Sequence, residues 1–419
     1  MNRIFFSFVF CAFFFASCTR DTGTNPKDIE NESTLGWKSA GFVPDKATLN
    51  TRGGGLQKMV HSGNWIMLMD AWTSPVADKP GYSTYTPRLF ISKVGSNVWD
   101  TLKVPTTENI KSLYADSSGF YIGTYVTAEL WKYAPDEKKW ENMNLIHLKE
   151  GEGFNIYGIS KYQGKLIVSM AGFKDSTNKE VISFVKLQQD SGWIDLETPP
   201  IQYSDYSDSL TVPLQFHKGV EWNNRFYAAT TDGVWYLNSG SSSWTHLPTL
   251  PKVKWTAALV RNTIQDIVIH RDRLYVVDGE ADLVYEWNES GQNWNMIDSL
   301  YLNFYPDSTY TVYTNTPGTI ETLVSDGKHL FVSGKPALPQ VYTGDYGEPY
   351  ENIPKGWRDL RDGWCTEYKC VSTATLYSLD VIGDTLYAAA WEGLFKFPLA
   401  DLDSVIAGEN DFFGMTVKK

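Results

Sequence analysis

Short runs of consecutive apolar residues recur along the chain, each preceded by a small polar turn. Residues 274–277 (LYVV) and 386–389 (LYAA) are clear examples. A short run rich in β-branched and aromatic residues, bounded by turn residues, predicts a buried β-strand. Seven such runs begin at Trp65, Phe120, Leu166, Phe226, Leu274, Leu330 and Leu386.

These runs stand 46 to 60 residues apart. Within each repeat a further strand leads through a polar turn to an aromatic residue, so that each repeat supplies four strands, a to d. A period of about 40–50 residues built from short strands is typical of a β-propeller. We therefore predict an all-β fold, a seven-bladed β-propeller of four-stranded antiparallel blades over residues 35–419. The aromatic residues are Trp99, Trp140, Trp193, Trp244, Trp294 and Tyr350.

The last repeat is incomplete, because no turn and tryptophan follow residues 394–397 (LFKF). The missing pattern occurs near the N-terminus, where residues 33–42 (STLGWKSAGF) resemble residues 239–247 (SGSSSWTHL). We expect the N-terminal strand to be the outer strand of the last blade. This pairing would close the ring and remove an exposed sheet edge.

Two propeller families share parts of the repeat. The spacing from Tyr133 to Trp140 resembles kelch repeats, and residues 238–244 (NSGSSSW) and 289–294 (ESGQNW) resemble degenerate Asp-box turns of sialidase-type propellers. In both families the aromatic residue after the turn packs between adjacent sheets. The resemblance implies a structural role for the six aromatic residues and no particular activity. The paired kelch glycines and the sialidase Phe-Arg-Ile-Pro motif are absent from the sequence.

The first 17 residues have the pattern of an export signal, with Arg3 before an apolar run of 13 residues from Ile4 to Ala16. Such a run is too short to span a bilayer. The segment around Cys18 resembles a bacterial lipoprotein box, which implies lipidation of Cys18 and a membrane anchor; the alternative is an ordinary secretory peptide cleaved nearby. Residues 18–34 are polar and predict a tether. We expect an exported protein, lipid-anchored to a bacterial membrane on its periplasmic or cell-surface side.

The net charge and the cysteine content of the chain limit the kinds of partner and metal site that we expect. The formal net charge of −12 argues against nucleic-acid binding, because phosphate-binding surfaces need excess lysine and arginine. Cys365 and Cys370 predict a disulfide in an oxidising compartment, with a metal pair as the alternative. No other Cys or His pair has zinc-like spacing, so we predict neither a metal site nor a cofactor.

The long segments between strands all fall at b–c or d–a connections, which emerge on the same face of a propeller. Long loops on a rigid scaffold are where binding residues concentrate, so this face is the expected site of function. The segments are 70–88, 171–180, 198–213, 299–319 and 354–375.

Aromatic and charged residues are frequent in these segments. We predict stacking platforms and polar anchors for a ligand; the alternative is that the aromatic rings only pack the loops onto the ring. The stacking residues are Trp72, Tyr305, Trp357 and Trp364, and the polar anchors are Arg358, Arg361 and Asp362.

The sequence therefore predicts an envelope-anchored binding module that holds a glycan or a partner protein. Two alternatives remain open. One is a glycoside hydrolase or lyase with paired carboxylates on the same face. The other is a structural subunit of an envelope complex.

Overall fold

A computed structural model describes the strands and many of their connections. The chain divides into two compact units, Met1–Thr34 and Leu35–Lys419, and every described residue belongs to the second. Among these residues no helix is long and apolar enough to cross a membrane. The described residues are 38–42, 55–75, 83–149, 151–173, 181–198, 215–251, 263–278, 283–299, 319–335, 340–342, 357–359, 376–390 and 393–402.

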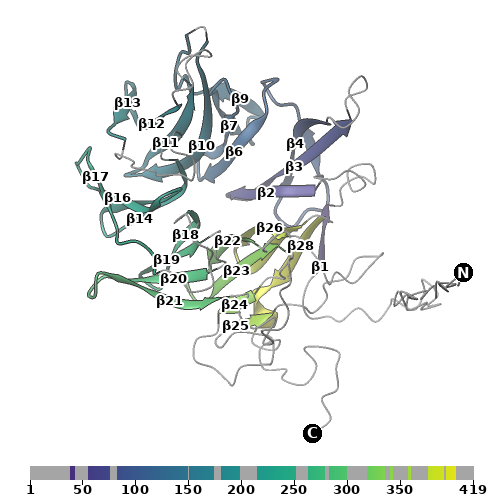
Figure 1. The fold of residues 1–419 in the computed structure, drawn as a ribbon. Helices are drawn as coiled ribbons and strands as arrows, with labels where there is room; N and C mark the ends of the chain where they lie inside the picture. Colours follow the sequence, from purple (N-terminus) through teal and green to yellow (C-terminus); the bar gives the residue numbers. More distant parts are fainter. Residues whose placement is uncertain are drawn as a thin grey trace, which may run out of the picture. The chain divides into compact units, whose positions relative to one another are not determined.

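The described residues form seven antiparallel sheets of four strands each (Figure 1). In six of these sheets the strands are consecutive in sequence. The first three blades contain β2 (Gly55–Ser62), β3 (Trp65–Pro75), β4 (Ser83–Lys93) and β5 (Asp100–Leu102); β6 (Ile110–Asp116), β7 (Gly119–Thr124), β8 (Leu130–Ala134) and β9 (Lys139–Asn142); and β10 (Gly153–Tyr162), β11 (Lys165–Phe173), β12 (Val181–Gln189) and β13 (Gly192–Leu196). The next three contain β14 (Phe216–Trp222), β15 (Arg225–Thr230), β16 (Gly233–Asn238) and β17 (Trp244–His246); β18 (Ile264–His270), β19 (Arg273–Asp278), β20 (Leu283–Asn288) and β21 (Asn293–Ser299); and β22 (Thr319–Ser325), β23 (Leu330–Lys335), β24 (Gln340–Tyr342) and β25 (Trp357–Asp359). The last blade contains β26 (Leu376–Ile382), β27 (Thr385–Ala390), β28 (Gly393–Pro398) and β1 (Lys38–Phe42), and a 3-10 turn, η2 (Leu399–Asp401), follows β28.

The blades are arranged around an axis. The first strand of each sheet contacts the first strand of the next, and β26 contacts β2, so the order is cyclic. A separate apolar cluster fills each boundary between successive blades, including the boundary between the last and the first. The predicted fold class, an all-β propeller of four-stranded antiparallel blades, is confirmed.

The second strand of each blade explains the apolar runs of the sequence. All six residues of β7 are buried, as are the last five of β15 and of β27. A central strand of a blade contacts neighbouring blades through both faces, so apolar side chains are needed at consecutive positions instead of alternate ones. The outer strand β9, by contrast, alternates between exposed and half-buried positions.

Strand β1 completes the last blade. It pairs antiparallel with β28, with Lys38 opposite Lys396 and Phe42 opposite Leu394. Ala40 and Phe42 are buried, and they belong to the apolar cluster between the last blade and the first. The predicted closure by the N-terminal strand is confirmed.

The tryptophans of the outer strands join neighbouring blades. The indole nitrogens of Trp140, Trp193, Trp244 and Trp294 each donate to a backbone carbonyl in the segment after the preceding blade, at 2.7 to 3.1 Å. Trp99 packs edge-on against Phe42 at 5.4 Å between ring centroids. These five aromatic residues have the structural role that the resemblance implied. Tyr350, the sixth, lies outside the described residues.

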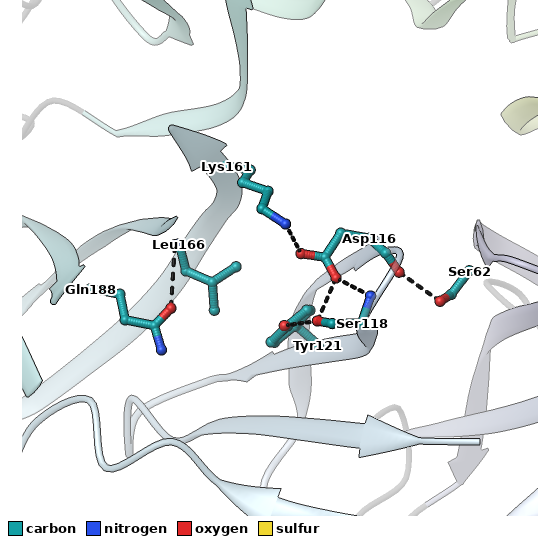
Figure 2. Close-up of polar contacts among 7 residues, drawn as sticks. All are labelled: Ser62, Asp116, Ser118, Tyr121, Lys161, Leu166 and Gln188. Atoms are coloured by element: carbon teal, nitrogen blue, oxygen red, sulfur yellow. Dashed lines mark hydrogen bonds and ion pairs between the residues drawn. The ribbon is translucent and has the colours of Figure 1, made fainter. Parts of the chain in front are cut away.

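Polar contacts join the blades at the turns between first and second strands. Figure 2 shows Asp116 at the end of β6, between Ser62 of the first blade and Lys161 of the third. Its carboxylate accepts hydrogen bonds from Lys161 Nζ at 2.9 Å and from Ser118 N at 2.7 Å, while Ser62 Oγ donates to its backbone carbonyl at 2.6 Å. Burial acts to raise the pKa of Asp116, but the hydrogen bonds from Ser118 and Lys161 outweigh it and hold the pKa below its ordinary value.

A histidine lies at the boundary between the fifth and sixth blades. His270 is buried at the end of β18, and its Nδ1 is 2.8 Å from Ser325 Oγ of β22. Burial, reinforced by the charge of Arg271, lowers the pKa of His270 to about 4. The imidazole is therefore neutral at pH 7.

Candidate functional site

A β-bulge occurs at the same place in every first strand. The register between the first and second strands of each blade skips one residue near the start of the first strand. A bulged residue has no direct partner across the ladder and is re-aimed relative to its neighbours. The seven bulged residues are Gln57, Lys111, Tyr157, His217, Gln265, Glu321 and Tyr377.

A central cavity of about 840 Å³ is lined by the first strands. Six of the bulged residues contribute to its wall; Glu321, the seventh, has a described backbone position in β22 but no described side chain. Each first strand starts from a d–a connection, so the bulges lie toward the face on which function was predicted. Among the described residues, no group of three or more His, Cys, Asp or Glu side chains could hold a metal ion.

Lys111 lies between two aromatic rings of this cavity. Its Nζ is 5.1 Å from the ring centroid of Tyr157 and 5.8 Å from that of Tyr125. Burial lowers the pKa of Lys111. Within the described part of the chain Lys111 forms no ion pair, so its described cation contacts are the two ring faces.

His217 is partly buried in the same wall, on β14. Its pKa falls to about 4 because of burial and the positive charges of Lys58 and Lys111. The imidazole is therefore neutral at pH 7, with one nitrogen as donor and the other as acceptor. Burial is the larger cause of this pKa shift, and the two lysine charges add to it.

Two carboxylates of the cavity wall are engaged by the protein. Asp266 is 2.7 Å from Lys218 Nζ and accepts backbone hydrogen bonds from Ile267 and Leu323, each at 2.7 Å. Asp380 lies 2.6 Å from His61 Nδ1. These contacts make both groups structural ties between blades.

The structure gives backbone positions for three of the predicted binding residues. Trp72 is in β3, opposite Thr86. The prediction that 70–88 connects two strands was wrong at both ends, because β3 continues to Pro75 and β4 begins at Ser83. Trp357 and Arg358 are also in a strand, β25, opposite Tyr342 and Val341. No side chain of these three residues is described.

The position of Trp357 in β25 corresponds to that of a tryptophan in another blade. This residue begins the outer strand of its blade, the place that Trp244 holds in β17. The sequence assigned that place to Tyr350, which precedes β25. Tyr305, Arg361, Asp362 and Trp364, together with Cys18, Cys365 and Cys370, lie outside the described residues.

The sequence contains a signal for the bulges. Near the start of each first strand an apolar residue is followed by the bulged residue and then by a small or polar residue, as in residues 110–112 (IKS), 216–218 (FHK) and 264–266 (IQD). Aligning the repeats on the second strands would have exposed this column. The prediction instead gave weight to loop length and aromatic content.

Solved structures share this architecture at low sequence identity. Virginiamycin B lyase from Staphylococcus aureus, solved with quinupristin, superposes with a TM-score of 0.54 at 11% identity over 86% of this chain and 99% of that one. YCF48 from Cyanidioschyzon merolae gives 0.50 at 12% identity over 87% and 99%. By fold, the chain is a β-propeller.

A third neighbour comes from a larger protein. The extracellular domain of the putative hybrid two component system BT4673 from B. thetaiotaomicron gives a TM-score of 0.52 at 10% identity. The match covers 87% of this chain and 39% of that one. No protein-family model and no curated protein matches the sequence. At such identities the likeness establishes the fold alone.

Proposed function

We propose that this propeller is an exported, lipid-anchored carbohydrate-binding protein, whose ligand enters the central cavity from the face of the b–c and d–a connections. The observation that carries the proposal is the column of bulges, which points described side chains from six blades into one cavity of about 840 Å³. Ligand pockets in proteins have volumes of about 300–1,000 Å³. β-Bulges are frequent next to active sites, where they re-aim side chains.

The chemistry of the wall suits a sugar. Tyr125, Tyr157 and Tyr377 offer flat ring faces for stacking, and Gln57 and Gln265 offer amide groups for hydroxyls. In this proposal the loop residues Trp72, Tyr305, Trp364, Arg358, Arg361 and Asp362 extend the contact outward, and Trp357 joins them or packs between blades. Because Asp266 already contacts Lys218 and Asp380 already contacts His61, we favour binding over glycoside hydrolysis.

A glycan array tests the proposal with the soluble chain starting at Thr19. We expect binding to a small set of glycans, and loss of that binding on Tyr157→Ala. Ile194→Ala is the matched control, because Ile194 is 46% exposed on the outer strand β13, away from the cavity. Silence across the array, or binding that survives Tyr157→Ala, would overturn the proposal and leave a protein partner as the next function to test.

A further inference from the structure

Positive charge gathers in the cavity of an otherwise acidic protein. The chain has a formal net charge of −12, yet Lys58, Lys111 and Lys218 all line this one cavity. The described carboxylates of the wall, Asp266 and Asp380, are two against these three lysines and contact Lys218 and His61. A concave site with an excess of one sign of charge concentrates ligands of the opposite sign. The cavity therefore differs from the rest of the chain in the ligand that it favours.

The three lysines are not equivalent. Lys218 is neutralised by Asp266 at 2.7 Å. Lys58 has a further contact of its own, and its charge acts on His217. Lys111 combines partial burial with two aromatic neighbours, and among the residues that the structure describes no carboxylate pairs with it.

The neighbours of Lys111 are arranged to hold an anionic sugar. Tyr157 and Tyr125 flank the ammonium group, so a sugar ring bound beside either tyrosine would bring an acidic substituent toward Nζ. His217, neutral at pH 7, can donate one further hydrogen bond. Charge-assisted hydrogen bonds of this kind are about twice as strong as neutral ones.

From this arrangement we infer that the ligand is an acidic glycan, whose carboxylate or sulfate group binds Lys111 beside Tyr157 and His217. The inference rests on the proposed function and specifies its ligand class. Lys111 is the specificity-determining residue of this assignment.

The experiment uses the soluble chain starting at Thr19 and a panel of uronate-bearing, sialate-bearing and sulfated oligosaccharides. Each is presented beside a neutral form, the methyl ester for carboxylates and the desulfated sugar for sulfates. We expect acidic forms to bind at least about tenfold more tightly than their neutral forms. Whether esterification or desulfation abolishes binding identifies the anionic group.

Three variants locate the contact. Lys111→Met keeps the length and apolar stem of the side chain but removes its charge, and we expect its affinity for the acidic form to fall about tenfold or more. Lys111→Arg keeps the charge, and we expect it to retain most of the affinity for the acidic form. Lys132→Met is the matched control, because Lys132 Nζ lies 5.9 Å from the ring centroid of Tyr121 in the same blade but outside the cavity. Thermal melting checks that each variant is folded.

The outcomes separate the two proposals. Equal binding of acidic and neutral forms, lost on Tyr157→Ala, would overturn the acidic-ligand inference and keep the carbohydrate function. Acidic binding that survives Lys111→Met would overturn the assignment of Lys111. Binding of an oligoglutamate peptide with no glycan bound at all would overturn the carbohydrate function itself.

Discussion

Replacing Phe42 with alanine tests how the ring is closed. Phe42 is 7% exposed and packs against Phe90 and Trp99, with ring centroids 4.8 and 5.4 Å apart. Phe42 belongs to the last blade through β1, while Phe90 and Trp99 belong to the first. The aromatic group therefore lies on the boundary that joins the two ends of the chain.

The magnitude follows from the buried area. An aromatic side chain buries about 150–250 Å², which corresponds to about 4–6 kcal/mol at 25 cal/mol per Å². Alanine keeps part of that area, and measured Phe→Ala changes in cores cost about 3–5 kcal/mol. Since β1 is a short outer strand that can shift to fill the space, we expect a loss of about 3 kcal/mol in the free energy of unfolding. Domains typically have about 5–15 kcal/mol in total.

The assay is urea denaturation of the chain starting at Thr19, followed by tryptophan fluorescence. Lys38→Ala is the matched control on the same strand; Lys38 is exposed and faces Lys396, so we expect a change within about 0.5 kcal/mol. A chain shortened to begin at residue 44 lacks β1 and should be destabilised more than Phe42→Ala. A loss below about 1 kcal/mol for Phe42→Ala, with an unchanged denaturant slope, would refute the closure argument.

Three further predictions concern contacts within and between blades. Asp116→Asn should lower the free energy of unfolding by about 1–3 kcal/mol at pH 7. The difference from wild type should shrink as pH falls below about 3.9 and through the lowered folded pKa of Asp116. Asp195→Asn, at an exposed position, should change the free energy of unfolding little, and equal losses for the two variants would contradict the bridging role of Asp116. Gly172→Ala should lower the free energy of unfolding by about 2 kcal/mol or more, because the added Cβ would lie 1.9 Å from the Gly153 carbonyl oxygen. Gly153→Ala is the control, since the nearest atom to its added Cβ would be 3.5 Å away. Urea midpoints that fall equally in the two variants would contradict the steric argument. In the unfolded chain His270 binds a proton near pH 6.5, but in the folded protein only near pH 4. As pH is lowered from 6.5 to 4, this histidine should therefore reduce the free energy of unfolding by up to about 1.4 kcal/mol per pH unit. His270→Asn should reduce that slope in urea titrations at stepwise pH, and an unchanged slope would show that the folded histidine titrates normally.

Local pattern was sufficient for the blades. The apolar runs at residues 120–123 and 386–389 predicted buried strands because the second strand of a blade is covered on both faces. The incomplete last repeat predicted the pairing of β1 with β28, since an unpaired strand edge needs a partner wherever that partner lies in the sequence. Both features are encoded within a few consecutive residues.

The site depended on the tertiary structure. Lys111 and His217 are remote in sequence and belong to the second and fourth blades, and only the cyclic packing of first strands places both in one cavity. A bulge arises when two strands pair, so the residue that it re-aims cannot be identified from either strand alone. The pKa of His217 likewise depends on burial and on lysines from other blades. The sequence by itself thus determined the blades and the strand that closes them, because those follow from local apolar patterning, whereas the cavity and its charge were decided by how the blades surround the axis.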